Sequence, residues 1–124
     1  MKAIFVESTG FSGIVSYHLG DRDYARLQRL LMAQPNAGDV MPGCGGLRKV
    51  RISDPGRGKG KRGGIRVIYL HVPVANWFYM LDLYGKDEKD DLAPEEKKHL
   101  RVLAESLKNQ ALVKFLAQKG KKKS

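Results

Sequence analysis

The apolar residues of the N-terminal half change from an extended to a helical period. The run "AIFVE", residues 3–7, is typical of a short opening strand. In the segment 21–35, apolar side chains recur at helical spacing, at Tyr24, Leu27, Leu30 and Leu31. Asp21 suits an N-cap and Pro35 suits a helix end, so we expect this segment to be an amphipathic helix.

The C-terminal half predicts three further strands and a second helix. The segment 47–53, "LRKVRIS", alternates, with Arg48, Val50 and Ile52 on one face and Leu47, Lys49 and Arg51 on the other. The strand-like runs 65–72 and 75–85 meet at "PVAN", which predicts a hairpin. A helix is expected over 93–118, with Pro94 near its first position and an apolar stripe at Leu100, Leu103 and Leu107.

This order of strand, helix, three strands and helix predicts an α+β protein with a small, mostly antiparallel sheet. The chain has 124 residues, of which 42% are hydrophobic, enough for one core. No internal repeat is present. We therefore expect a single domain over residues 1–118, followed by a basic, disordered tail over residues 119–124.

Cysteine usage and hydropathy indicate where such a chain works. The lone Cys44 excludes an internal disulfide and suits a reducing compartment. The opening apolar run is too short for a signal peptide. The longest apolar region, 65–84, is interrupted by polar residues and does not resemble a membrane span. We expect a soluble, cytoplasmic protein with no membrane partner.

The net charge of +10 is concentrated in two places rather than spread over the chain. The tail 119–124 is basic, and the segment 48–66 opposes eight basic residues to Asp54 alone. The eight are Arg48, Lys49, Arg51, Arg57, Lys59, Lys61, Arg62 and Arg66. A concentrated positive field favours a polyanionic partner, nucleic acid before an anionic membrane.

The glycines inside this basic segment do not make it a nucleotide-binding loop. Gly58, Gly60 and Gly63 formally fit G-x-G-x-x-G, but that fingerprint requires a helix directly afterwards, and a strand pattern follows here. A plain, solvated hairpin connection remains the simplest alternative. The flanking strands favour a binding role, because strand-borne cations are held more rigidly than loop cations. We expect RNA-backbone binding by Arg48, Arg57, Lys59, Lys61 and Arg62.

The motifs "GGLRKVRIS", "GKGKRGGIRVIYL" and "FYMLDLYGKDEKDDL" resemble the RelE/ParE superfamily of toxins from type II toxin–antitoxin systems, most closely its HigB-type branch. The resemblance runs from "IFVES" to the helix near Asn109. It implies a microbial RNase fold, a small curved sheet with helices packed on one face. It also implies a toxin that enters the ribosomal A site, cleaves mRNA there and is silenced by a HigA-type antitoxin.

The same resemblance implies a metal-independent site without a cofactor, built from lysine, arginine and tyrosine. The family's two basic positions on one strand fall on Lys49 and Arg51, and its arginine before an apolar run falls on Arg66. Its Gly-Lys after the last strand falls on Gly85 and Lys86. The resemblance therefore implies Lys49, Arg51, Arg66 and Lys86 as catalytic residues, and Tyr84 completes the expected set as a proton donor.

Two departures from the family pattern affect the proton donor. Asp87 replaces the arginine that follows the family's Gly-Lys, and Ala93 stands where the family has a tyrosine. Tyr84, beside Lys86, is our substitute for the missing donor. For the proton acceptor, a lysine crowded by like charges can be partly neutral, and Lys49 between Arg48 and Arg51 is the residue that fits best.

Two other functions remain open at the level of sequence. A non-enzymatic nucleic-acid-binding module would explain the charge without catalysis. A ParE-like toxin that poisons gyrase would share the fold but lack the basic catalytic cluster. The deciding feature is whether Lys49, Arg51, Arg66 and Lys86 converge in one site.

Overall fold

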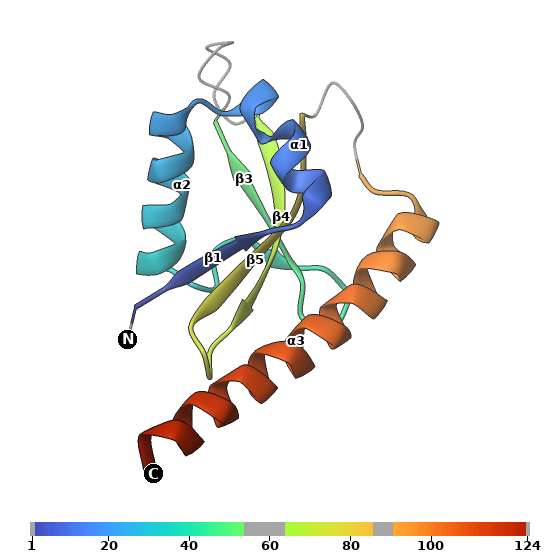
Figure 1. Cartoon of the computed structure of the whole chain (residues 1–124). Coiled ribbons are helices and arrows are strands. Elements are labelled where there is room, and N and C mark those ends of the chain that lie inside the picture. Colours follow the sequence, from blue (N-terminus) through green and yellow to red (C-terminus); the bar gives the residue numbers. More distant parts are fainter. Residues whose placement is uncertain (1, 54–63, 86–90, 124) are drawn as a thin grey trace.

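The computed structural model describes residues 2–53, 64–85 and 91–123 of the chain (Figure 1). Its strands are β1 (Ile4–Glu7), β2 (Asp39–Val40), β3 (Arg48–Ile52), β4 (Ile65–Val72) and β5 (Trp77–Gly85). Its helices are α1 (Thr9–His18), α2 (Asp21–Ala33) and α3 (Pro94–Lys123). None of the helices in these ranges combines the length and the apolar character needed to cross a membrane.

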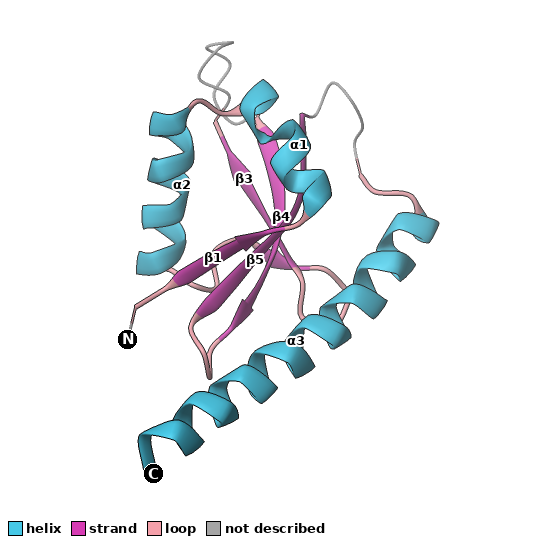
Figure 2. Cartoon of the chain, viewed as in Figure 1, coloured by secondary structure: helices cyan, strands magenta, loops and turns pink. Residues whose placement is uncertain are grey.

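The strands form one twisted sheet in the order β1-β5-β4-β3-β2 (Figure 2). β1 runs parallel to β5, and the other neighbouring strands run antiparallel. The expected α+β class and mostly antiparallel sheet are therefore confirmed. The predicted hairpin joins β4 to β5 through residues 73–76, where Asn76 has a φ of 51°. Asparagine is one of the few residues other than glycine that enters this left-handed region readily.

Helices cover both faces of the sheet, which corrects the expectation that they share one face. One core lies between the sheet and α1 with α2, and contains Phe11, Leu27, Leu31, Val67, Tyr69, Phe78 and Met80. The second core lies under α3, and contains Ile68, Leu70, Tyr79, Leu81, Ala104 and Ala111. β4 explains this arrangement, because its side chains are buried at all positions except the half-buried His71. A strand that is apolar on both sides needs a cover on each face.

The helix α1 was not predicted. Ser8 is its N-cap and accepts a 3.0 Å hydrogen bond from the Phe11 N–H. Phe11, Ile14 and Val15 point into the core at helical spacing. Glycines at positions 10 and 13 weaken the helical propensity of this segment, so tertiary packing stabilises it.

The expected helix over 21–35 is present, but its ends differ from the prediction. Gly20 is the N-cap of α2, so Asp21 is the first helical residue rather than the cap. Its carboxylate still suits that position, because the N-terminus of a helix favours negative charge. The helix ends at Ala33, with Gln34 as the C-cap, one residue before Pro35. A residue that precedes proline is disfavoured in the helical conformation, which agrees with this end.

The long helix α3 begins at Pro94 as expected and continues to Lys123. Its backbone therefore includes residues 119–123, which we had assigned to a disordered tail. Leu100, Leu103 and Leu107 pack against the second core, as their spacing predicted. At the first residue of β5, the Lys114 ammonium lies 5.0 Å from the centre of the Trp77 ring. Figure 1 shows α3 crossing one side of the sheet and projecting beyond the β4–β5 hairpin.

Candidate functional site

Two arginines and a tyrosine line up across three neighbouring strands on the α3-facing side of the sheet. Arg51 on β3 lies directly opposite Arg66 on β4, and Arg66 lies directly opposite Tyr84 on β5. Residues directly opposite one another share a face of the sheet. We call Arg51, Arg66 and Tyr84 the cross-strand row. Lys49 lies two residues before Arg51 and faces the same side.

A β-bulge in β5 determines that Tyr84 joins this row. Leu70 pairs with Tyr79, whereas Ile68 pairs with Asp82, so β5 carries one extra residue at this point. Simple alternation from Tyr79 would turn Tyr84 toward α1 and α2. The extra residue reverses the alternation and places Tyr84 on the α3-facing side. Bulges often re-aim a side chain in this way beside active sites.

The two arginines of the row lie in different environments. The Arg51 residue is exposed, whereas Arg66 is only 6% exposed and donates a 2.8 Å hydrogen bond to the Gly64 carbonyl. Like charges directly opposite each other on neighbouring strands destabilise a sheet. A bound anion between or above Arg51 and Arg66 would relieve this repulsion. The arrangement is therefore suited to a phosphate group, which arginine binds with a planar fork of donors.

The Tyr84 phenol is a protonated hydrogen-bond donor at physiological pH. Burial is the main reason that its pKa is raised to about 12, and the charges of Asp91, Asp82 and Glu96 add to the increase. The charge of Arg66 opposes it by favouring the phenolate. The phenol thus keeps its proton beside a buried positive charge, as a proton donor to a departing oxygen requires.

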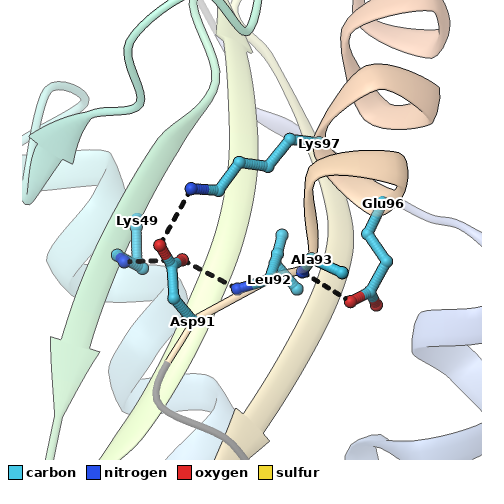
Figure 3. A network of polar contacts seen from close by, with 6 residues as sticks. All are labelled: Lys49, Asp91, Leu92, Ala93, Glu96 and Lys97. Carbon is cyan, nitrogen blue, oxygen red and sulfur yellow. Dashed lines mark hydrogen bonds and ion pairs between the residues drawn. The ribbon is translucent and has the colours of Figure 1, made fainter.

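Lys49 is bound to a carboxylate just before α3 (Figure 3). Its ammonium lies 3.3 Å from Asp91 Oδ1, and Lys97 donates to Asp91 Oδ2 at 2.8 Å. The Leu92 N–H also donates to Oδ1, at 2.8 Å. The Lys97 hydrogen bond is the largest of the effects that lower the pKa of Asp91 to about 2, followed by the Leu92 N–H. Lys49 is therefore in contact with an anionic side chain, whereas the sequence showed only its like-charged neighbours Arg48 and Arg51.

The Glu96 side chain caps the first turn of α3, from which Lys97 extends. Glu96 Oε1 accepts a 2.9 Å hydrogen bond from the Ala93 N–H, as in the second half of a capping box. The Lys97 N–H in turn donates to the Ala93 carbonyl at 3.0 Å. Figure 3 shows Lys97 reaching from this turn toward β3. The helix start therefore sets the distance between Lys97 and Lys49.

Arg48 lies on the opposite face of β3, outside the cross-strand row. Its guanidinium donates to the carbonyls of Asn36 and Gly38 at 2.8 and 3.2 Å. The Tyr69 hydroxyl, on the neighbouring strand, donates to the Ala37 carbonyl at 2.7 Å. These contacts fix the loop between α2 and β2. Arg48 therefore has a structural role here, which does not support its expected place among the RNA-binding residues.

A comparison with known families adds to this geometry. Residues 32–123 match the family described as "RelE toxin of RelE / RelB toxin-antitoxin system". The chain belongs to this family. It is therefore a toxin of a toxin–antitoxin system, as the resemblance of its motifs implied, and an antitoxin partner follows from the family. The matched region contains β3, β4, β5 and α3, and hence both the cross-strand row and the residues around Asp91.

Several predicted site residues of the toxin lie outside the described ranges. These are the expected catalytic residue Lys86 and the expected RNA-binding residues Arg57, Lys59, Lys61 and Arg62. Among the described residues, Lys49 and Arg51 share one face as expected, and the strand register adds Arg66 and Tyr84 to that face. A shared sheet face is thus established for three of the four cations, and their convergence in one site stays a prediction.

Asp91 and Lys97 are the residues of this region that the sequence did not single out. Asp91 belongs to a run of acidic residues that is most simply interpreted as a solvated turn. Its contact with Lys49 joins residues 42 positions apart, so no local pattern predicts it. The sequence offered only an indirect indication, because Asp91 and Lys97 lie on either side of the expected helix start at Pro94.

Proposed function

We propose that this toxin is a metal-independent endoribonuclease that cleaves mRNA in the ribosomal A site and thereby inhibits translation. A HigA-type antitoxin is the partner that we expect to silence it. The observation that carries the proposal is the cross-strand row of Arg51, Arg66 and Tyr84, with Lys49 on the same face. Family membership supports the same function.

The row suits a reaction in which RNA supplies its own nucleophile. The 2′-hydroxyl gives its proton to water and attacks the adjacent phosphorus, a new O–P bond forms, and the bond from phosphorus to the 5′-oxygen breaks. The products carry a 2′,3′-cyclic phosphate and a 5′-hydroxyl. Arg51 and Arg66 stabilise the negative charge that accumulates on the phosphoryl oxygens, as preorganised donors do at developing oxyanions.

Tyr84 is placed to protonate the departing 5′-oxygen. Its pKa of about 12 makes it a weak acid at neutral pH, but it remains a stronger acid than water, whose pKa is about 15.7. An alkoxide leaving group is basic enough to take a proton from such a phenol. Tyr84 therefore replaces the family tyrosine that is absent at Ala93.

The ribosome is expected to orient the mRNA and to open the catalytic face, which the free toxin does not do by itself. Acid–base catalysis supplies only about 10² to 10⁴-fold, so most of the acceleration must come from orienting the mRNA strand. Arg66 and Tyr84 are almost fully buried in the free toxin. Contact with mRNA therefore requires that ribosome binding favours a state in which this face is more open. Both requirements agree with a toxin that acts on ribosome-bound mRNA and not on free RNA.

Primer extension on mRNA in a reconstituted translation system tests this proposal. We expect cleavage within the A-site codon, and no cleavage when the nucleotide on the 5′ side of the scissile phosphate carries a 2′-deoxy sugar. The deoxy substrate is the matched control, because it binds the ribosome but lacks the nucleophile. Arrested translation with intact mRNA would instead favour a binding module. Toxin-dependent breaks in gyrase-bound DNA would favour a ParE-like function.

A further inference from the structure

The Asp91 carboxylate occupies a position that is built from two lysines and one backbone amide (Figure 3). One oxygen accepts from Lys97 at 2.8 Å, and the other accepts from Lys49 at 3.3 Å and from the Leu92 N–H at 2.8 Å. Lysines and backbone N–H groups are the donors through which proteins contact nucleic-acid phosphates. The donors that hold this carboxylate are therefore also suited to one phosphate of an RNA backbone.

This position is open to solvent and lies in a pocket. The side chains of Lys49, Asp91 and Lys97 are 31%, 46% and 38% exposed. The three residues line a pocket of about 240 Å³, whose other wall is formed by residues 39–42 and Cys44. Water screens ion pairs that are this exposed, so their net strength is small. A polyanion gains free energy by releasing counterions, which enables it to replace the carboxylate.

The position also adjoins the cross-strand row. Lys49 lies two residues from Arg51 on the same face of β3. The Tyr84 phenol responds to the charge of Asp91 as well as to that of Arg66, so the carboxylate and the buried arginine act on the same group. An RNA strand held by the row would therefore bring a neighbouring phosphate toward Lys49 and Lys97.

We propose that Lys49 and Lys97 form a phosphate-binding subsite that the Asp91 carboxylate occupies until RNA displaces it. Lys97 is then an RNA-binding residue contributed by α3, and Asp91 is a built-in competitor for the same donors. The subsite rests on the proposed function in one respect, that RNA is the ligand of this face. It makes no use of the cleavage step.

Asp91→Asn is the central variant in the experiment. Asparagine keeps an acceptor for the Leu92 N–H but removes the negative charge. Glu105→Gln is its matched control, because it also removes one carboxylate charge, at a residue that binds Lys108 at 2.9 Å and does not line the pocket. Lys97→Ala has a matched control in Lys108→Ala. Thermal unfolding of each variant measures whether the fold is kept.

Fluorescence anisotropy with a labelled RNA hexanucleotide, in a series of KCl concentrations, gives the affinity of each variant. We expect Asp91→Asn to bind RNA about fivefold more tightly than Glu105→Gln, since one nearby unit charge in a high dielectric has an effect of about that size. Lys97→Ala should bind more weakly than Lys108→Ala, with a salt slope lower by about 0.7, as one lost phosphate contact on a single strand predicts. Combining Asp91→Asn with Lys97→Ala should abolish most of the increase in RNA affinity that Asp91→Asn gives alone.

Equal affinities of Asp91→Asn and Glu105→Gln, or of Lys97→Ala and Lys108→Ala, would overturn the subsite. The three residues would then only anchor the start of α3. Cleavage of ribosome-bound mRNA, measured in parallel, separates this result from the proposed function. RNA affinities that follow the expected order while wild-type toxin leaves mRNA intact would support the subsite and contradict the endoribonuclease. Cleavage of mRNA without the expected order of RNA affinities would support the endoribonuclease and contradict the subsite.

Discussion

The two faces of β3 use neighbouring cations in different ways. On the face toward α2, the Arg48 guanidinium binds backbone carbonyls of the loop that ends at Gly38. On the face toward α3, the Lys49 ammonium binds the exposed carboxylate of Asp91. Carbonyls of a fixed loop cannot be exchanged for a ligand, whereas a side-chain carboxylate can be replaced by another anion. Adjacent positions on one strand thus differ in their partners, backbone carbonyls for Arg48 and an exchangeable carboxylate for Lys49, although both add equally to the net charge.

Removing the buried charge of Arg66 should have the largest effect, which we expect on the rate of mRNA cleavage. We expect Arg66→Ala to slow cleavage of ribosome-bound mRNA by about 10² to 10³-fold, the usual loss when one preorganised oxyanion donor is removed. Ribosome affinity, measured by co-sedimentation, should change only a few-fold, because one contact among many is lost. Arg66→Lys keeps the charge but not the planar fork, so it should restore binding better than cleavage. A parallel loss of binding and cleavage with an unchanged Tm would indicate that the cross-strand row only attracts RNA through its charge and takes no part in catalysis.

The basic residues of the segment 54–63, between β3 and β4 in the sequence, extend the comparison beyond the strands. Replacing Arg57, Lys59, Lys61 and Arg62 with alanine should reduce the salt slope of RNA binding by up to about 3, since each neutralised phosphate of a single strand contributes about 0.7. The fold should be kept, as far-ultraviolet circular dichroism can verify. An unchanged slope would place RNA binding elsewhere, most plainly at the basic C-terminal end of α3.

A matched pair of arginines on β3 tests the difference between the two faces directly. Arg48→Ala should lower the free energy of unfolding by about 1 kcal/mol, the usual contribution of such hydrogen bonds, and leave cleavage by the folded toxin unchanged. Arg51→Ala should weaken RNA binding without loss of stability, because it relieves the repulsion with Arg66. Thermal unfolding and RNA anisotropy on both variants measure these effects. Exchanged phenotypes would show that the two faces had been assigned the wrong way round.

Protonation of Asp91 at low pH should give the smallest effect, a small loss of folding stability. Its pKa in the folded toxin, about 2, lies below its unfolded value near 3.8, so its ionised form stabilises the fold above pH 4. This contribution is lost as the pH falls from 4 to 2. The carboxylate is 46% exposed, so solvent screening limits it to about 1 kcal/mol or less. The difference in Tm between wild type and Asp91→Asn should therefore shrink from pH 6 to pH 2. A Tm difference that stays constant between pH 6 and pH 2 would contradict the stabilising ion pairs of Asp91 with Lys49 and Lys97.

The part of the site that depends on local periodicity could be predicted from the sequence. Alternation along residues 47–53 placed Lys49 and Arg51 on one face, because the side-chain period of a strand is a local property. Whether Arg66 joined them depended on the β3–β4 register. The strands are separated by residues 53–64, a connection too long for the turn rules that fix the register of tight hairpins.

Features set by tertiary structure could not be predicted. The bulge near Leu81 turns Tyr84 toward α3, and no residue pattern in β5 marks it. The Lys49–Asp91 contact forms only when α3 packs on the sheet. The helix α1 was missed for a related reason, because it depends on burial of Phe11 rather than on strong helical propensity. The family resemblance supplied the expected function but not these contacts.

The most direct test of the central claim, that the cross-strand row cleaves mRNA, compares Tyr84→Phe on two substrates. One is ordinary ribosome-bound mRNA, and the other carries sulfur in place of the departing 5′-oxygen, which leaves readily without protonation. Single-turnover cleavage by Tyr84→Phe should fall by about 10² to 10⁴-fold on ordinary mRNA and return close to the wild-type rate on the sulfur substrate. An equal loss on both substrates, with an unchanged Tm, would contradict proton donation by Tyr84 and the assignment of the row as the catalytic site.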